Sequence, residues 1–189
     1  GTGSPQANKN RAEACVAVIA DGVFFLIDIG GGASEQTDLM NLPLSKLNAI
    51  FITHLHSDHF ADLPLIANNS WRFGRKAPLL VYGPENTLNV VNALNEAYKY
   101  DRGYRGQNQK AFMVSFQVAT TKGYDIKTPE TNKRTLVREF SNGLKVYAFN
   151  VAHAPVKPAF GYRIEYKGKV VVISGDTKFT PNMITHSKG

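Results

Sequence analysis

The sequence is poor in cysteine and has no long hydrophobic run. Its single cysteine, Cys15, excludes an intramolecular disulfide and a cysteine-rich zinc site. Because Cys15 lies in the apolar run 15–19, we expect it to be a small buried side chain. No apolar stretch approaches the roughly 20 residues that span a bilayer, so no membrane span is expected. An absence of disulfides is typical of the cytoplasm but also allows the periplasm, and the compartment stays open.

The sequence also lacks an initiator methionine, since it begins Gly1-Thr2-Gly3. No signal peptide is recognisable within these residues, and we expect that a signal peptide or a first strand precedes them. Glycine-rich segments occur at 1–3 and 30–32, but neither has the spacing of a nucleotide-binding loop. Tight turns are the simpler interpretation. Asp28, which precedes the second of these segments, is interpreted as a turn-capping carboxylate or one that supports a metal ligand.

Positive charge exceeds negative charge, with 22 Lys and Arg against 15 Asp and Glu and a formal net charge of +7. This excess suits an anionic substrate. No Lys/Arg run of the kind that forms a nucleic-acid arm is present, and a solvated basic surface is the simpler interpretation. The basic residues are spread over several loops, as Arg72, Arg75 and Lys76, as Arg102 and Arg105, and as Lys133 and Arg134.

Short apolar runs separated by turn residues predict a single α/β domain over 1–189 with mixed sheets. Strands are predicted at 15–20, 23–29, 47–53, 79–82, 136–140, 144–152, 160–166 and 169–174, and helices at 60–68 and 86–98. Asp21-Gly22, Asn142-Gly143 and Lys167-Gly168 supply the turns between neighbouring strands. The polar, poorly periodic segment 101–135 predicts a long surface excursion with one strand at 112–118, so that an insert occupies about 86–135.

The strongest chemical signal is the motif Thr53-His54-Leu55-His56-Ser57-Asp58-His59, placed where a buried strand ends. Zinc prefers imidazole and carboxylate ligands, and a metal site needs several that converge. His54 and His56 are two residues apart, so in extended backbone they project to the same side. Asp58 and His59 follow after a turn and are placed to serve a second metal. This clustering is difficult to explain by core packing, and the motif predicts a metal site.

Two later residues belong with this motif because each follows a predicted strand. His153 follows the strand at 144–152, and Asp176 follows the strand at 169–174. An α/β fold commonly gathers its site at strand ends. We therefore predict that His153 and Asp176 are metal ligands together with the motif.

These residues resemble the metallo-β-lactamase superfamily, and within it the ribonuclease Z and arylsulfatase-like branch. The resemblance is carried by the histidine motif with Leu63-Pro64, by the lone His153, and by the segments Gly1-Thr2-Gly3-Ser4-Pro5, Gly161-Tyr162-Arg163-Ile164 and Ser174-Gly175-Asp176-Thr177. It implies a four-layer αββα sandwich with the metals at one edge of the two sheets. It also implies two zinc ions per chain, with manganese or iron as alternatives. Members of this branch are often dimers, so by analogy we expect that this chain can form a homodimer.

The resemblance assigns each ligand a role. His54, His56 and His153 would hold the first metal, Asp58 and His59 the second, and Asp176 would bridge the two. The branch has a further histidine ligand well beyond the Gly-Asp-Thr motif, and we expect that it lies outside this chain. His186 is too close to Asp176 to take that role and falls in an expected helix.

The implied chemistry is hydrolysis by a metal-bound hydroxide. Asp58 would orient the water or accept its proton, and His153 is a candidate for the group near the leaving group. Ribonuclease Z enzymes that process transfer RNA carry a long tRNA-binding arm between the lone histidine and the aspartate. Here the strands predicted between 153 and 176 leave no room for an arm. The expected substrate is therefore RNA or a smaller phosphodiester.

Two alternatives stay open. One is an arylsulfatase-like sulfate-ester hydrolase, in which the tyrosines and arginines of 98–105 would cap a small anionic substrate. The other is a metal-binding module without turnover. β-Lactam hydrolysis ranks lower, because Gly-Asp-Thr stands where true lactamases commonly carry a cysteine.

Overall fold

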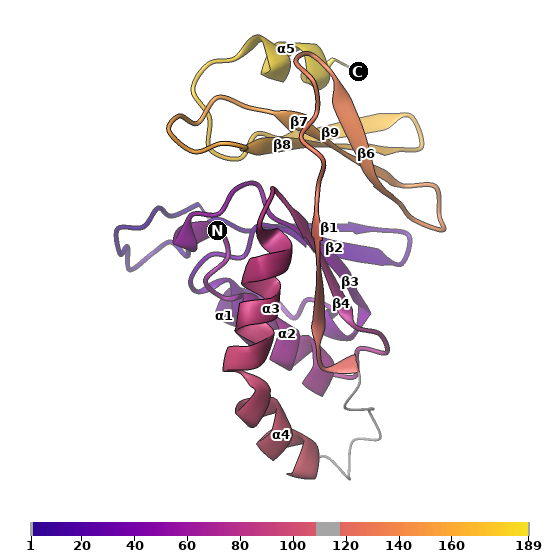
Figure 1. Ribbon diagram of the computed structural model, residues 1–189. Coiled ribbons are helices and arrows are strands. Elements are labelled where there is room, and N and C mark those ends of the chain that lie inside the picture. The colour runs from indigo at the N-terminus through magenta and orange to yellow at the C-terminus, as the bar shows by residue number, and fades with distance from the viewer. Residues whose placement is uncertain (1, 109–117, 189) are drawn as a thin grey trace.

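The computed structural model describes residues 2–108 and 118–188. Two β-sheets are stacked face to face, and helices cover the outer face of each (Figure 1). Helices α1 (Ala33–Leu39), α2 (Leu63–Arg72) and α3 (Thr87–Ala97) lie on the first sheet, and α5 (Pro181–Ser187) lies on the second. The layers therefore follow the αββα order that the resemblance implies.

The first sheet has five strands in the order β1 (Val16–Ala20), β2 (Val23–Ile27), β3 (Leu47–Phe51), β4 (Leu79–Gly83) and β5 (Thr121–Asp125). The β1–β2 hairpin is antiparallel and turns at Asp21 and Gly22, which both have positive φ, as the sequence predicts. Strands β2 to β5 run parallel. Parallel strands end at the same edge of a sheet, so the residues that follow β2 and β3 are brought together there.

The second sheet is an antiparallel meander of β6 (Arg134–Glu139), β7 (Lys145–Asn150), β8 (Phe160–Tyr166) and β9 (Lys169–Ile173). The two-residue turn Lys167-Gly168 joins β8 to β9, so the short hairpin predicted between His153 and Asp176 is confirmed. Aromatic side chains fill the space between the sheets, including Phe25, Phe51, Phe140, Phe160 and Tyr162. A second core lies between the first sheet and its helices.

The predicted surface excursion over 101–135 is wrong for most of its described part. Residues Lys99–Asn108 form helix α4, and Thr121–Asp125 form the parallel edge strand β5. Helix α4 was not predicted because polar contacts, which leave no apolar periodicity in the sequence, hold it in place. Asp101 accepts a hydrogen bond from Asn68, and Arg102 donates to the Asn95 carbonyl. The strand predicted at 112–118 lies almost wholly in 109–117, outside the described residues.

Smaller differences concern α1 and Cys15. Helix α1 was not predicted, because its seven residues carry little apolar periodicity. Cys15 is half-buried rather than buried, at the border of the core beneath the helices. That burial still raises the pKa of its thiol to about 11. Among the helices of 2–108 and 118–188, none has the length and apolar character that a membrane crossing requires.

Candidate metal centre

The predicted site residues gather at one edge of the sandwich, where strands of both sheets end. The motif follows β3, His153 follows β7, and Asp176 follows β9. Two main-chain contacts hold these loops together: the Phe160 N–H donates to the Thr53 carbonyl at 2.9 Å, and the Lys178 N–H donates to the Ala152 carbonyl at 2.7 Å. Side chains more than 90 positions apart in the sequence, such as His56 and His153, thus lie close together at this edge.

The turn after β3 buries half of the motif. A short 3₁₀ helix, Ser57–His59, turns the chain so that Asp58 and His59 are buried, whereas His56 is exposed. Gly30 permits this turn: a Cβ atom there would lie 1.9 Å from the Asp58 carbonyl oxygen, so only glycine fits. The Ile29 N–H donates to the His59 carbonyl at 2.8 Å and fixes the turn to the end of β2.

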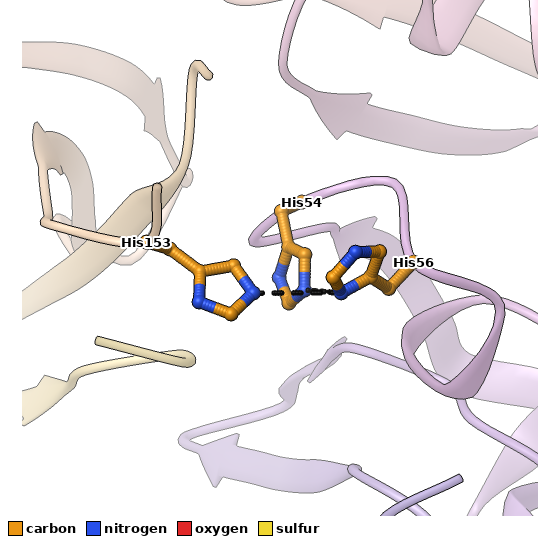
Figure 2. A group of neighbouring side chains, drawn as sticks. All are labelled: His54, His56 and His153. Atoms are coloured by element: carbon orange, nitrogen blue, oxygen red, sulfur yellow. Dashed lines mark hydrogen bonds between the residues drawn. The ribbon is translucent and has the colours of Figure 1, made fainter. Parts of the chain in front are cut away.

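The first group of candidate ligands is His54, His56 and His153. Figure 2 shows the three rings turned toward a common point, with His153 reaching in from a segment remote from the other two. His56 Nδ1 lies 3.0 Å from His54 Nε2 and 3.4 Å from His153 Nε2. These ligand atoms lie within 4.8 Å of one another, as a shared cation requires.

The second group is His54, His59 and Asp176, whose ligand atoms also lie within 4.8 Å of one another. His59 Nε2 is 3.6 Å from Asp176 Oδ1 and 3.7 Å from Asp58 Oδ2. Asp58 is buried beside His59 but belongs to neither group of three found among the described residues. His54 belongs to both groups, which places the two candidate metal positions side by side.

A buried network behind the rings fixes which nitrogen of each ring faces the site. Asp28 accepts hydrogen bonds from the Thr53 N–H, the Thr53 hydroxyl and His59 Nδ1, each at 2.8 Å. The Thr53 hydroxyl gives its proton to Asp28, so its oxygen can accept from His54 Nδ1 at 3.1 Å. Both rings then carry their proton on Nδ1 and turn the lone pair of Nε2 toward the ligand groups.

Asp28 thus supports the candidate ligand His59, and its backbone has a positive φ of 55° in the turn after β2. The role of Thr53 was not predicted, although Thr53 opens the motif. A Thr directly before a His at a strand end is a weak signal, because threonine is common in strands. Its function here depends on Asp28, which lies 25 residues earlier.

The electrostatics of the site favour uncharged ligand rings at His54. Burial, and then the neighbouring rings of His59, His153 and His56, lower the pKa of His54 to about 3. Burial opposes the charged form of His59, but its hydrogen bond to Asp28 and the charges of nearby carboxylates outweigh this and raise its pKa. Burial also raises the pKa of Asp28, although its hydrogen bonds act in the opposite direction.

The donor set fits a divalent transition metal. Neutral imidazole nitrogens and carboxylate oxygens are the ligands that zinc prefers, and both groups consist of these alone. A carboxylate behind a ligating histidine is the usual support of such a site. His186 lies elsewhere, in α5 against Phe149 on the outer face of the second sheet, in agreement with its exclusion from the predicted ligands.

Comparison with known proteins gives the family. Residues 1–188 match the family model described as Anti-Pycsar protein Apyc1. The chain is 32% identical over 186 residues to a ribonuclease Z of Mycobacterium marinum, covering 97% of this chain and 63% of that protein. It therefore spans about three fifths of the length of this relative.

Solved structures show the same fold. The metallo-β-lactamase fold protein YhfI from Bacillus subtilis aligns with a TM-score of 0.65 at 17% identity, over 96% of this chain and 63% of that one. The short form of human tRNase Z aligns with a TM-score of 0.61 at 22% identity, over 88% of this chain and 62% of that one. The chain belongs to the Anti-Pycsar protein Apyc1 family and, with its ribonuclease Z-like sequence and fold, to the metallo-β-lactamase superfamily.

Proposed function

We propose that this chain carries the metal-dependent active site of a phosphodiester hydrolase. The observation that carries the proposal is that His54 belongs to two groups of donors, so that two cations would lie side by side. The ribonuclease Z relatives support a phosphodiester substrate, and the net charge of +7 suits it. The alternative of an arylsulfatase-like sulfate-ester hydrolase has no such support among the relatives.

The metals would be two zinc ions, with manganese or iron as alternatives, held by six residues: His54, His56, Asp58, His59, His153 and Asp176. Zinc bound at these groups would supply a water with a pKa of about 7 and positive charge for the ester oxygens. Asp176 would be the ligand that bridges the two metals, as the family resemblance implies. Its exposed carboxylate lies 3.6 Å from His59 Nε2 and belongs to the group of His54 and His59.

The residues around the metals would have different roles in the reaction. Asp58 is buried beside His59, and its carboxylate would orient the attacking water or accept its proton. His56 is exposed and His153 is half-buried, so this side of the site is open to an incoming ester, and His153 would lie near the leaving group. Asp28 and Thr53 would hold the rings of His59 and His54 in place without touching the substrate.

The substrate is RNA or a smaller phosphodiester. Between His153 and Asp176 the chain forms only the β8–β9 hairpin, where a tRNA-binding arm would be inserted. Without that arm, binding would depend on the open side of the metal centre and on other basic surfaces of the protein. This favours a small diester or a short single strand over a folded transfer RNA.

The test measures metal content and hydrolysis in the intact protein. The substrates are bis(p-nitrophenyl) phosphate, a short RNA and p-nitrophenyl sulfate, and the variant is His54→Ala with His56→Ala. The matched control is His186→Ala, which removes a histidine outside both ligand groups. Circular dichroism shows whether each variant is folded.

Stoichiometric metal and diesterase activity, both lost in the double variant and kept by folded His186→Ala, would support the proposal. Activity on the sulfate ester alone would replace the phosphodiesterase by a sulfatase. Bound metal with no activity on any substrate would favour a metal-binding module without turnover. Diesterase activity that survives in the double variant would overturn the assigned site.

A further inference from the structure

A group of basic residues lines a second pocket, far from the metal centre. We call this the basic pocket; it has a volume of about 340 Å³ and opens beside the amino ends of β3 and β4. Its basic residues come from four segments: Lys46 before β3, Arg75 and Lys76 before β4, Lys122 on β5, and Arg138 on β6. None of the sequence motifs predicts it, because the five residues are scattered over 93 positions.

The basic pocket and the metal centre occupy opposite edges of the first sheet. Lys46 directly precedes β3, whereas His54 follows that strand. At ~3.3 Å per residue in a strand, the two ends are on the order of 20 Å apart. The basic pocket is therefore a separate surface, and a ligand bound there would not contact the candidate metal ligands directly.

The positive charge of the basic pocket is not balanced by nearby carboxylates. Its lining residues include no Asp or Glu, and none of its five basic side chains forms a salt bridge within the described chain. Some surface lysines elsewhere differ, since Lys99, Lys133 and Lys167 each pair with a carboxylate. Like charges gathered in a concave surface raise the local potential and attract anions.

Two arginines form the fixed part of the pocket. Arg75 is only 2% exposed, and its guanidinium donates to Ser70 Oγ at 3.0 Å and to the Ala67 carbonyl at 3.3 Å. Burial lowers the pKa of Arg75 to about 10, so it stays charged at neutral pH without a carboxylate partner. Arg138 donates to the Tyr82 hydroxyl at 2.8 Å and lies over the Phe140 ring. The exposed Lys46, Lys76 and Lys122 surround these fixed charges.

An aromatic ring lies beside the charges. Tyr124 lines the pocket and is 43% exposed. One face of its ring stacks on Tyr82, with centroids 5.1 Å apart, and Tyr82 stacks in turn on Phe51. The ring is thus held rigidly by its neighbours while part of it stays open to solvent. Basic side chains beside an open aromatic ring are the combination that binds single-stranded nucleic acid, because phosphate meets the charges and a base stacks on the ring.

We propose that the basic pocket binds the phosphate groups of a nucleotide or of single-stranded RNA, with a base stacked on Tyr124. This inference concerns binding alone and does not depend on catalysis at the metal centre. A solvated basic surface would need neither a concave shape, nor a buried arginine without a counter-charge, nor an aromatic ring held at the rim. The basic pocket combines all three.

The test is a binding titration of the intact protein with fluorescent single-stranded RNA, with a mononucleotide and with inorganic phosphate. The variant is Lys76→Gln with Lys122→Gln, and the matched control is Lys9→Gln with Lys169→Gln, two exposed lysines outside the pocket. We expect the affinity for RNA to fall roughly tenfold in the pocket variant but not in the control. The slope of log K against log salt concentration should become shallower by about 0.7 for each lost phosphate contact. Tyr124→Ala should weaken the binding of RNA but not the binding of inorganic phosphate.

The His54→Ala, His56→Ala variant separates this proposal from the proposed function, because RNA binding at the basic pocket should survive in it. RNA binding much tighter than that of the mononucleotide would identify a strand as the ligand, and equal binding would identify a nucleotide. An equal loss of affinity in the pocket and control variants would show general attraction to a basic protein and overturn the proposal. So would wild-type protein that binds neither RNA nor mononucleotide.

Discussion

The two edges of the first sheet carry opposite kinds of polar chemistry. At the carboxyl ends of the strands, His54 and His59 are buried and fixed by Asp28 and Thr53. At the amino ends, the exposed Lys46, Lys76 and Lys122 form no salt bridge within the described residues. A metal site requires atoms placed to within a few tenths of an ångström, which needs a buried supporting network. A pocket that attracts anions requires only a positive electrostatic potential, which flexible lysines supply without fixed positions.

The largest effect is expected at His54, whose ring lies in both groups of candidate donors although its one free nitrogen can bind one metal. We expect His54→Ala to remove the first metal and to weaken the second, because the His54 ring lies against His59, whereas His153→Ala should remove the first metal and leave the group around His59 filled. Hydrolysis should fall roughly a thousandfold in His54→Ala, since metal catalysis contributes several kcal/mol to transition-state stabilisation. Metal analysis of the purified, folded variants and the rate with bis(p-nitrophenyl) phosphate measure both effects. Equal metal loss in the two variants would contradict the wider effect expected of His54.

The next effect concerns the network behind the rings. Asp28→Asn should weaken metal affinity by about 10- to 100-fold, because an amide cannot accept from His59 and both Thr53 groups as the carboxylate does. The matched control is Asp62→Asn, another buried carboxylate, which accepts the Ser34 N–H at 2.8 Å outside both ligand groups. Competition with a chelator measures the affinity. If both variants lose affinity equally, the effect of Asp28 is general destabilisation.

The smallest effect on the metal centre is expected at the other edge. Arg75→Met should lower the free energy of unfolding by about 1–3 kcal/mol, because the Ala77 carbonyl and Ser70 Oγ lose the hydrogen bonds that Arg75 donates to them. Metal content should not change, since Arg75 lies at the opposite edge of the sheet. Urea unfolding and metal analysis check the two parts. Arg72→Met, at an exposed position nearby, is the control and should leave stability within about 0.5 kcal/mol. Metal loss in folded Arg75→Met would show that the edges are coupled.

Much of the fold could be predicted because strong local signals mark it. The Asp21-Gly22 and Lys167-Gly168 turns and the apolar runs around them place four strands correctly. Helix α4 and strand β5 could not be predicted in the same way. Their side chains are mostly polar, and what fixes them is docking: the Asn68–Asp101 hydrogen bond for α4, and the close approach of Gly123 to Leu88 for β5. Such contacts leave no periodic pattern in the sequence.

The sequence by itself determined the candidate metal ligands, because the spacing of His54, His56 and His59 at a strand end leaves few other uses for these side chains. The tertiary structure alone decided how they are grouped and supported. Asp28 reaches His59 only because β2 and β3 are parallel neighbours, so residues 31 positions apart end at the same edge. The basic pocket likewise exists only after four segments have folded together. Local patterns specify which chemistry is available, and strand order decides which groups meet.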